Sequence, residues 1–163
     1  DMTDRCDIIA KFWNELDDSP FVMLGIPAQG AHSVPMTAQF DDDYPNQLFF
    51  FTAKDNRLAE NLGQGGVEAM AQFASKGHDF FACLRGRLTP IKDHDIRDKF
   101  WSKAVDAWFE GGKTDPHLDV LKFDLIDAEM WLADMDVEGL FKMIFGGDIN
   151  RDDAREKHIE TAM

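Results

Sequence analysis

A short polar turn after an apolar strand carries the residues of this chain that are best suited to chemistry. Leu48–Phe51 are four consecutive apolar residues, which indicate a strand buried on both faces. Thr52 and Asp55 have the spacing of a capping box and predict that a helix begins there. Unpaired backbone N–H groups near Asn56, together with the Arg57 guanidinium, then form a candidate phosphate site. In the alternative interpretation Thr52 only caps the helix and Arg57 lies in water, and capping boxes are far commoner than phosphate sites.

The other reactive side chains have no spacing that predicts catalysis or metal binding. Cys6 and Cys83 are far apart and outside any CxxC motif, so we expect two reduced thiols. The acidic run Asp41–Asp43 could contact a cation, but a solvated loop is the commoner case. The five histidines are scattered without ligand spacing: His32, His78, His94, His117 and His158. We therefore predict no metal site and no catalytic nucleophile.

Composition and charge limit the classes of protein to which this chain can belong. Its 163 residues are 44% hydrophobic, which is typical of a single globular domain with its own core. Seventeen basic and 31 acidic residues give a formal charge of −14, which would repel a nucleic acid backbone. No apolar run approaches the roughly 20 residues that cross a bilayer, and the first residues do not resemble a signal peptide. We expect a cytoplasmic protein that binds neither membranes nor nucleic acid.

The elements that position the turn are mostly short strands. An amphipathic helix is predicted over residues 8–16, and Phe21–Ile26 forms a hairpin with residues 34–40, in which Pro35 marks an edge or a bulge. Residues 67–73 and 78–88 form a second predicted hairpin by their alternating apolar positions: Val67, Ala69, Ala71 and Phe73 in its first arm. A glycine inside its second arm, Gly86, indicates a bulge or a close backbone approach.

The second half of the chain changes to helical spacing and then returns to strands. Apolar residues at helical spacing predict one helix over residues 93–111. Strands are predicted over residues 118–125 and 128–133, and a last amphipathic helix over residues 137–145.

These elements predict the domain organisation and the fold class. Residues 1–147 form the predicted domain, and residues 148–163 form a charged tail that we expect to be a loose helix or disordered. Six or seven short strands with a few helices favour a mainly β (α+β) fold, a small closed or partly open barrel with flanking helices.

Four short segments occur in a fixed order along the chain. They are VPMTAQFD at 34–41, LFFFTAKDNRL at 48–58, AWFEGGKTDP at 107–116 and AEMW at 128–131. In their order, their spacing and the strands between them, they resemble the general stress proteins of the pyridoxamine 5'-phosphate oxidase-like group. The resemblance covers most of the domain and implies the FMN-binding split-barrel fold, with six or seven strands and flanking helices.

The resemblance also implies which residues hold FMN. The implied contacts are Met36, Thr37, Phe51, Thr52, Asn56, Arg57 and Trp131. In the family, the positions of Met36 and Thr37 run along the flavin ring. Those of Phe51 and Thr52 approach the ring and the phosphate, and Asn56 and Arg57 stand at phosphate positions. The last, Trp131, matches a tryptophan that reaches the cofactor from the other subunit. The resemblance therefore implies a homodimer with two flavins at its interface.

The chain departs from the family pattern at three positions that usually carry a cation. Val34 stands in place of an arginine, and Gln39 and Leu58 in place of lysines. Each missing charge-assisted contact weakens binding by about 1.5–3 kcal/mol, so we expect FMN to bind weakly, to be replaced by a related flavin, or to be lost on purification. The candidate compensating cations are Lys54, Arg85 and Arg87.

The implied function is redox chemistry by a bound flavin. We expect an FMN-dependent oxidoreductase of the general stress protein type, with an unidentified small-molecule substrate. The alternative is a non-catalytic stress-response protein that stores or senses flavin. Oxidation of pyridoxamine 5'-phosphate itself is less favoured, because Arg151 and Arg155 stand in an acidic context unlike the basic C-terminal residues of the oxidases.

Overall fold

The computed structural model of the chain describes residues 2–132 and 158–163. The helices are α1 Met2–Asp18, η1 Pro27–Gln29, α2 Arg57–Glu60, α3 His94–Phe100, α4 Lys103–Asp106 and η2 Gly112–Thr114. The strands are β1 Phe21–Gly25, β2 Val34–Thr37, β3 Gln47–Ala53, β4 Val67–Ala74, β5 Phe80–Ile91, β6 Leu118–Leu132 and β7 His158–Ala162. The helix predicted over residues 137–145 lies outside the described residues.

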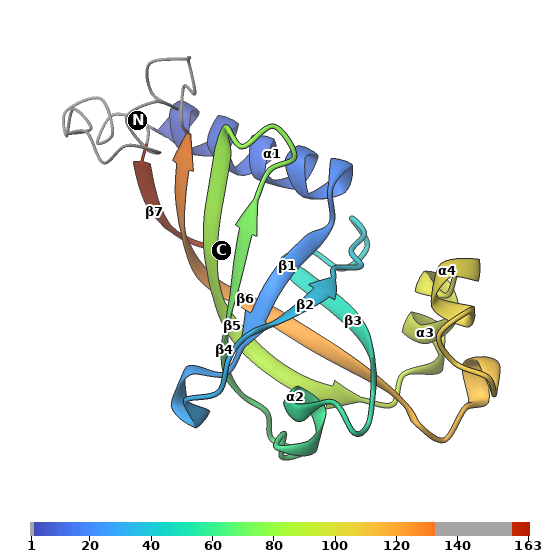
Figure 1. Cartoon of the computed structure of the whole chain (residues 1–163). Helices are drawn as coiled ribbons and strands as arrows, with labels where there is room; N and C mark the ends of the chain where they lie inside the picture. The colour runs from blue at the N-terminus through green and yellow to red at the C-terminus, as the bar shows by residue number, and fades with distance from the viewer. Residues whose placement is uncertain (1, 133–157) are drawn as a thin grey trace.

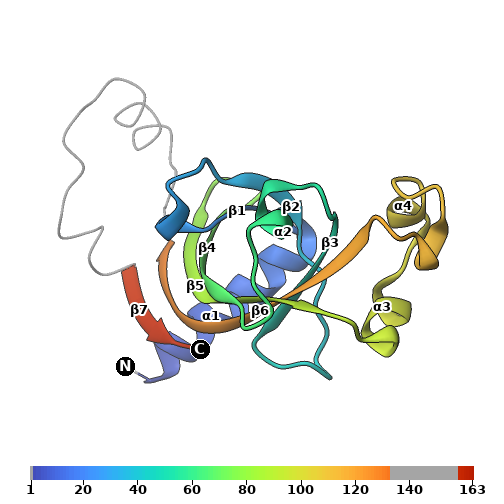
Figure 2. The same cartoon turned by 90° about the horizontal axis from the view of Figure 1, so that it is seen from below.

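The strands form one antiparallel sheet that curls into a nearly closed barrel (Figures 1 and 2). The strand order is β2-β1-β4-β5-β6-β3, and β7 pairs with β6. A single bridge between Gln39 and Phe49 joins β3 back to the end of β2. The remaining boundary between β2 and β3 is called the seam below. The predicted mainly β fold, a split barrel of six or seven strands with flanking helices, is confirmed.

The interior of the barrel is filled by apolar side chains from alternate strand positions. In β4, Ala69, Ala71 and Phe73 are buried, while the residues between them face outward. Helix α1 covers one end of the barrel in Figure 1, and its buried Phe12 meets Phe80 of β5 edge-on at 6.5 Å between ring centroids. The barrel is a packed core, so a ligand has to bind at its edges or on its outer face.

Strand β6 runs unbroken for 15 residues, where the sequence predicted two strands. The predicted break is wrong because Ile126 is only a bulge within β6: Arg85 and Gly86 of β5 face Asp127 and Leu125, Ile126 is left out of the ladder with β5, and pairing resumes on both sides of it. The predicted bulge or close approach at Gly86 is confirmed, since a Cβ atom there would lie 2.5 Å from the carbonyl oxygen of Asp124. The long strand carries residues from the barrel mouth to β7.

A lobe formed by α3, α4 and η2 projects from the barrel between β5 and β6 (Figures 1 and 2). The single helix predicted over residues 93–111 is wrong. Helix α3 ends at Trp101, whose backbone is extended, and the Ser102 hydroxyl accepts the N–H of Val105 and begins α4. A serine that caps a new helix competes with continuation of the old one. The lobe exposes Trp108, which is 84% accessible to solvent.

The end of the chain adds a strand to the sheet. Residues 158–162 form β7, in which Ile159 lies opposite Met130 of β6 and Thr161 lies opposite Ala128. The expectation of a loose helix or disorder is wrong for these residues. Thr161 is buried and Glu160 is exposed, so the short alternation suits an edge strand that covers part of the core. None of the helices in the described part of the chain is long and apolar enough to span a membrane.

Candidate functional site

The seam is the place where backbone groups of two facing strands have no partners. Hydrogen bonds alternate between the two edges of an antiparallel strand. The Ala38 N–H donates toward β1, and Gln39 and Phe49 exchange two bonds of 2.8 Å across the seam. By the same alternation the N–H and C=O groups of Thr37 and of Phe51 point into the seam. Among the described residues these groups have no hydrogen bond, so the seam presents donors and acceptors from both sides.

The turn after β3 closes the other end of the seam. Arg57 lies at the start of α2, and its Nη2 donates to the carbonyl oxygen of Ser33 over a long 3.5 Å. Ser33 belongs to the loop before β2, so this contact links the two sides of the seam. The guanidinium is exposed, and its remaining donors are available to a ligand.

Helix α2 begins at Asn56 and not at the predicted capping box of Thr52 and Asp55. The Asn56 side chain accepts the N–H of Leu58 at 3.0 Å, which makes Asn56 the cap. Thr52 stays in β3, because the pairing of β3 with β6 continues to Ala53. Strand pairing therefore prevails over a local capping pattern at this position. The predicted unpaired N–H groups near Asn56 are partly used, because Asn56 donates its N–H to the Ala53 carbonyl and Leu58 donates to the Asn56 side chain; the Arg57 guanidinium is the predicted donor that stays exposed.

The hydroxyl of Thr52 is a buried polar group without a partner. Thr52 is 6% exposed, and no described residue makes a hydrogen bond with its hydroxyl. An unpaired buried hydroxyl costs about 1–3 kcal/mol of folding free energy. Its position one residue beyond Phe51 puts it at the mouth of the seam. An oxygen atom of a ligand bound there would satisfy it.

The side chains of the other predicted residues point in different directions. Met36 is turned into the core and its backbone pairs with Val22 of β1. Thr37 is exposed. The ring of Phe51 packs against Trp101 of the lobe at 5.6 Å between centroids, so this residue offers the seam its backbone and not its ring. Six of the seven predicted contacts thus come together from β2, β3 and α2, and Trp131 does not.

The three positions that lack the family cations have structural roles here. Leu58 is buried beneath α2, and Val34 packs against the core at the end of β2. Gln39 supplies the backbone bridge to Phe49 that closes the barrel above the seam. None of the three side chains is positively charged; Leu58 and Val34 take part in packing, and Gln39 closes the barrel through its backbone.

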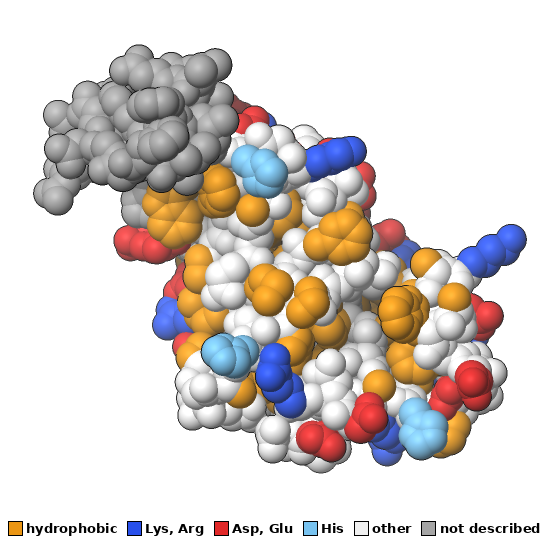
Figure 3. Space-filling view, viewed as in Figure 1, with side chains coloured by type: hydrophobic (Ala, Val, Ile, Leu, Met, Phe, Trp, Pro, Cys, Tyr) orange, Lys and Arg blue, Asp and Glu red, His pale blue; other side chains and the backbone are white. Residues whose placement is uncertain are grey.

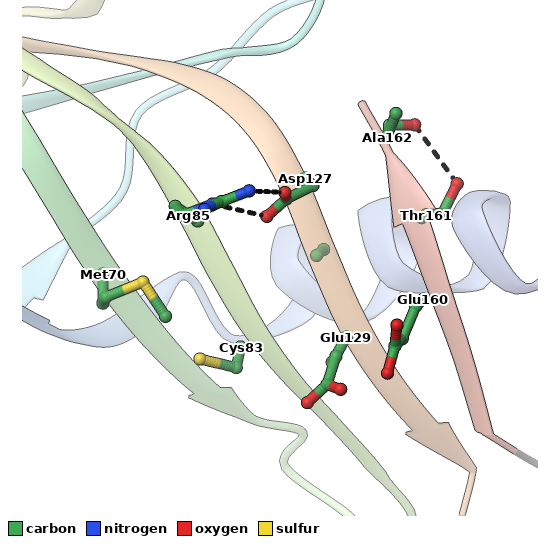
Figure 4. Close-up of a pocket in the computed structure, with 9 residues that line it drawn as sticks. Met70, Cys83, Arg85, Asp127, Glu129, Glu160, Thr161 and Ala162 are labelled. Atoms are coloured by element: carbon green, nitrogen blue, oxygen red, sulfur yellow. Dashed lines mark hydrogen bonds and ion pairs between the residues drawn. The ribbon is translucent and has the colours of Figure 1, made fainter.

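Two of the candidate compensating cations are held elsewhere. Arg85 forms a two-pronged ion pair with Asp127 on the outer face of the barrel (Figure 4). Arg87 donates to the carbonyl oxygens of Gly65 and Gly66 in the loop after α2. The expectation that either one replaces a missing phosphate contact therefore has no support in their hydrogen bonds. Lys54 lies on the turn itself and has no hydrogen bond or ion pair from its side chain within the described residues.

Arg85 borders a hollow of about 490 Å³ on the outer face, between β4, β5, β6 and β7 (Figure 4). Glu129 and Glu160 line the same hollow, which makes it acidic overall and unsuited to a phosphate. Burial raises the pKa of the Cys83 thiol at its edge, so this cysteine is a poor nucleophile. Within residues 2–132 and 158–163, no three His, Cys, Asp or Glu side chains are grouped to hold a metal ion.

Trp131 lies at the opposite end of β6 from the seam. Thr52 pairs with Asp119 near the start of β6, whereas Trp131 pairs with Phe81 near its end. Twelve residues of β6 separate these two positions, about 40 Å measured along the strand. Within one chain, Trp131 therefore cannot lie beside Thr52.

A family model described as pyridoxamine 5'-phosphate oxidase like matches residues 7–147. The chain belongs to this family. The match includes the whole seam, the lobe and β6. It confirms the family that the four sequence motifs indicate. No curated protein matches the chain.

Solved structures of general stress proteins resemble this family member along most of its length. A protein described as general stress protein 26 of Jannaschia sp. CCS1 is 29% identical and has a TM-score of 0.76, with 97% of this chain and 99% of that chain covered. The general stress FMN/FAD binding protein of Xanthomonas citri is 42% identical, with a TM-score of 0.73 and coverage of 80% and 92%. A general stress family protein of Xanthomonas campestris pv. campestris is also 42% identical, with a TM-score of 0.70 and coverage of 80% and 91%.

Sequence reasoning missed two features of the site. The first is the Ser33 carbonyl, which receives Arg57 across 24 residues of chain. The second is the pairing of unbonded backbone groups from Thr37 and Phe51. The sequence does indicate that β2 has unpaired backbone groups, because Pro35 lacks an N–H and marks β2 as an edge strand, as expected. The identity of the facing strand depends on the tertiary structure.

Proposed function

We propose that this protein binds FMN at the seam and serves as a flavin-dependent oxidoreductase with a small-molecule substrate. The observation that carries the proposal is the buried, unpaired hydroxyl of Thr52 beside the unpaired backbone groups of Thr37 and Phe51. A flavin has both a polar ring edge and a phosphate. The backbone groups of Thr37 and Phe51 suit the ring edge, and the Thr52 hydroxyl suits the phosphate. The relative from Xanthomonas citri is named for binding FMN and FAD, which supports a flavin as the ligand.

Each part of the seam has a role in this proposal. The backbone groups of Thr37 and Phe51 bind the polar edge of the ring and fix its orientation. Thr52, Asn56 and Arg57 bind the phosphate, with Arg57 as the charged partner that supplies a local positive charge in a chain of formal charge −14. FMN supplies hydride or electron transfer when bound, and the protein supplies binding, orientation and electrostatics.

A second candidate function is storage or sensing of flavin without catalysis. The observation that favours it is the packing of Val34 and Leu58 in the core, because neither position places a charge near the cofactor. Weak, reversible binding suits a sensor. Steady-state reduction of bound FMN by a nicotinamide or thiol donor distinguishes the two functions, since a sensor shows no turnover under conditions of saturating flavin.

Titration of FMN fluorescence tests the binding proposal. Arg57→Gln is expected to weaken FMN binding about tenfold or more, because a charge-assisted hydrogen bond to phosphate is lost. The control is Arg5→Gln in α1, which removes the same charge from an exposed position outside the seam. No saturable binding by the native protein, or equal affinities for both variants, would overturn the assignment of the site.

We further propose that the protein is a homodimer that pairs through the outer face of the barrel. Hydrophobic side chains are exposed over β1, β2 and β4 in Figure 3, and Phe21 and Met23 are 63% and 43% accessible. Phe81 and Trp131 are half-buried on the same face. Exposed apolar patches of this kind mark interaction sites on soluble proteins.

The register of the strands gives this face a particular geometry. Thr37 of β2 lies opposite Phe21 of β1, and Phe81 of β5 lies opposite Trp131 of β6. Ala74 of β4 lies between these two pairs, because it faces Phe81 and the β1–β4 register continues to Phe21. These five residues form one outward row across five strands, called the outer row, with Thr37 and Trp131 at its ends. Measured along the curled sheet, the ends are about 20 Å apart, from four strand spacings. A twofold axis through the middle of the row would place each Trp131 over the partner's seam.

Sedimentation velocity with and without FMN tests the dimer. Phe21→Asp is expected to shift the protein to monomers at micromolar concentration, because it places a charge in an apolar interface. Trp108→Asp is the control, since it changes the most exposed aromatic of the described residues but lies on the lobe and outside the outer row. Native protein that stays monomeric, or Phe21→Asp that stays dimeric, would refute the proposed interface.

A further inference from the structure

A second hollow lies between the barrel and the lobe, away from the seam. Its volume is about 190 Å³. It is lined by the end of β3, the β5–α3 turn and the η2–β6 connection. Its charged lining residues are Lys54, Lys92, Arg97, Lys113, Asp93, Asp115 and Asp119. A site with four Lys or Arg side chains contrasts with the strongly acidic chain that contains it.

Two of the three carboxylates in this hollow are already engaged by backbone groups. Asp93 accepts the N–H groups of Asp95 and Ile96 and caps α3. Asp115 accepts the N–H groups of His117 at 2.8 Å and Gly111 at 3.0 Å. These bonds lower the pKa of Asp115, which holds it as a carboxylate with its oxygens directed at the backbone. These two carboxylates keep their negative charge but turn oxygens toward the backbone, and four cations against three carboxylates leave the lining with a formal net charge of +1.

The cations in the hollow retain donors that the protein does not use. Arg97 donates to the carbonyl oxygen of Lys113 at 2.9 Å and pairs with Asp98 at 3.3 Å, and the Lys113 ammonium lies 3.6 Å from the same Asp98 carboxylate. Lys54 and Lys92 have no side-chain hydrogen bond or ion pair within the described part of the chain. Ammonium groups from separate elements thus surround one small space without an internal anion to pair them all.

We propose that this hollow is an anion subsite that binds the phosphate or diphosphate end of a small molecule. Several separate ammonium donors suit the many oxygens and double charge of a phosphate group better than a single carboxylate. The volume is below the roughly 300–1,000 Å³ of sites that enclose a whole ligand, so the remainder of the molecule would extend into solvent.

The proposed subsite is distinct from the flavin phosphate site. Lys54 donates its backbone N–H to His117 on the β6 side of β3, and Ile91 and Val120 form the floor of the hollow on that side. Arg57 contacts Ser33 on the β2 side. The two anion sites thus lie on opposite edges of β3, and this inference does not depend on flavin binding.

Calorimetric titration with inorganic pyrophosphate tests the proposal. The 163-residue protein is titrated at low ionic strength, where charge interactions are least screened, both without FMN and with saturating FMN. The test variant is Lys92→Gln combined with Lys113→Gln, both remote from α2. The matched control is Lys76→Gln combined with Lys103→Gln, which removes the same charge from exposed lysines outside the hollow. Titration with acetate tests whether a carboxylate serves as well as a phosphate.

We expect saturable binding of pyrophosphate that the test variant weakens at least tenfold and the control leaves within twofold. Backbone amide shifts on titration should concentrate at residues 92–97 and 113–119. Equal weakening in both variants, no saturable binding, or acetate binding as tight as pyrophosphate would overturn the subsite. Binding that disappears when FMN is saturating would assign the anion to the seam instead, which also overturns it while leaving the flavin proposal intact.

Discussion

Replacing the Thr52 hydroxyl with a methyl group should separate the folding role of this residue from its binding role. Thr52→Val keeps the shape of the side chain but removes a buried hydroxyl that has no partner among the described residues. We expect the flavin-free variant to be more stable than the native protein by about 1 kcal/mol, the lower end of the cost of an unsatisfied buried hydroxyl. A residue that served only the fold would show the opposite sign.

The same change should weaken FMN binding. A hydrogen bond from a hydroxyl to a charged phosphate contributes about 1.5–3 kcal/mol, which corresponds to roughly 10- to 150-fold in affinity. At a flavin concentration 100 times the native dissociation constant, the native protein gains about 2.7 kcal/mol of stability, and a variant that binds tenfold more weakly gains about 1.4 kcal/mol. The advantage of Thr52→Val should therefore vanish or reverse when FMN is added.

Urea denaturation with and without FMN, together with fluorescence titration, measures both effects. The matched control is Thr161→Val in β7, because Thr161 is also 6% exposed but its hydroxyl donates to the Ala162 carbonyl at 3.1 Å. The control should lose about 1 kcal/mol of stability and keep its affinity for FMN. If flavin-free Thr52→Val is less stable by more than about 1 kcal/mol, or its affinity for FMN is unchanged, the hydroxyl has another partner and the site assignment fails.

Two further predictions concern the barrel and its outer face. Gly86→Ala should destabilise the fold by about 1–3 kcal/mol in urea denaturation, because the new Cβ would lie 2.5 Å from the Asp124 carbonyl; Gly63→Ala, which meets no atom within 4 Å, should change stability by less than about 0.5 kcal/mol. Thiol labelling near pH 8 should modify Cys6 before Cys83, because burial raises the pKa of Cys83, and equal rates would contradict this.

The sequence by itself determined the class of the fold and the segment that contains the candidate site. Alternating apolar residues predict the hairpins because every second side chain of a strand faces the core, and this rule is local. Gly86 marked the irregular point of the β5–β6 pair for a similar reason, since only a residue without a side chain fits so close a backbone approach. The motifs around Thr52 and Arg57 identified the family.

Pairing between distant strands decided where helix α2 begins and whether β6 continues, and local sequence patterns could not predict either. A capping box predicted that Thr52 starts a helix, but seven residue pairs between β3 and β6 keep it in a strand. The chain at Ile126 and Asp127 looks like a turn, but Ile126 is a bulge within β6, and pairing with β5 on both sides of it lets the strand continue. In each case the winning interaction joins residues far apart in sequence, whose register no local pattern encodes.

The partners of charged side chains were also decided by tertiary structure. The sequence gives Arg57 as the implied phosphate contact, and Arg85 and Arg87 as candidates to compensate for the missing cations. Only the fold places Asp127 beside Arg85 and the carbonyls of Gly65 and Gly66 beside Arg87, and it leaves Arg57 at the seam. Long side chains bind whatever acceptor the barrel brings within reach. The sequence thus supplies the cations, and the closure of the sheet determines which of them can meet a ligand.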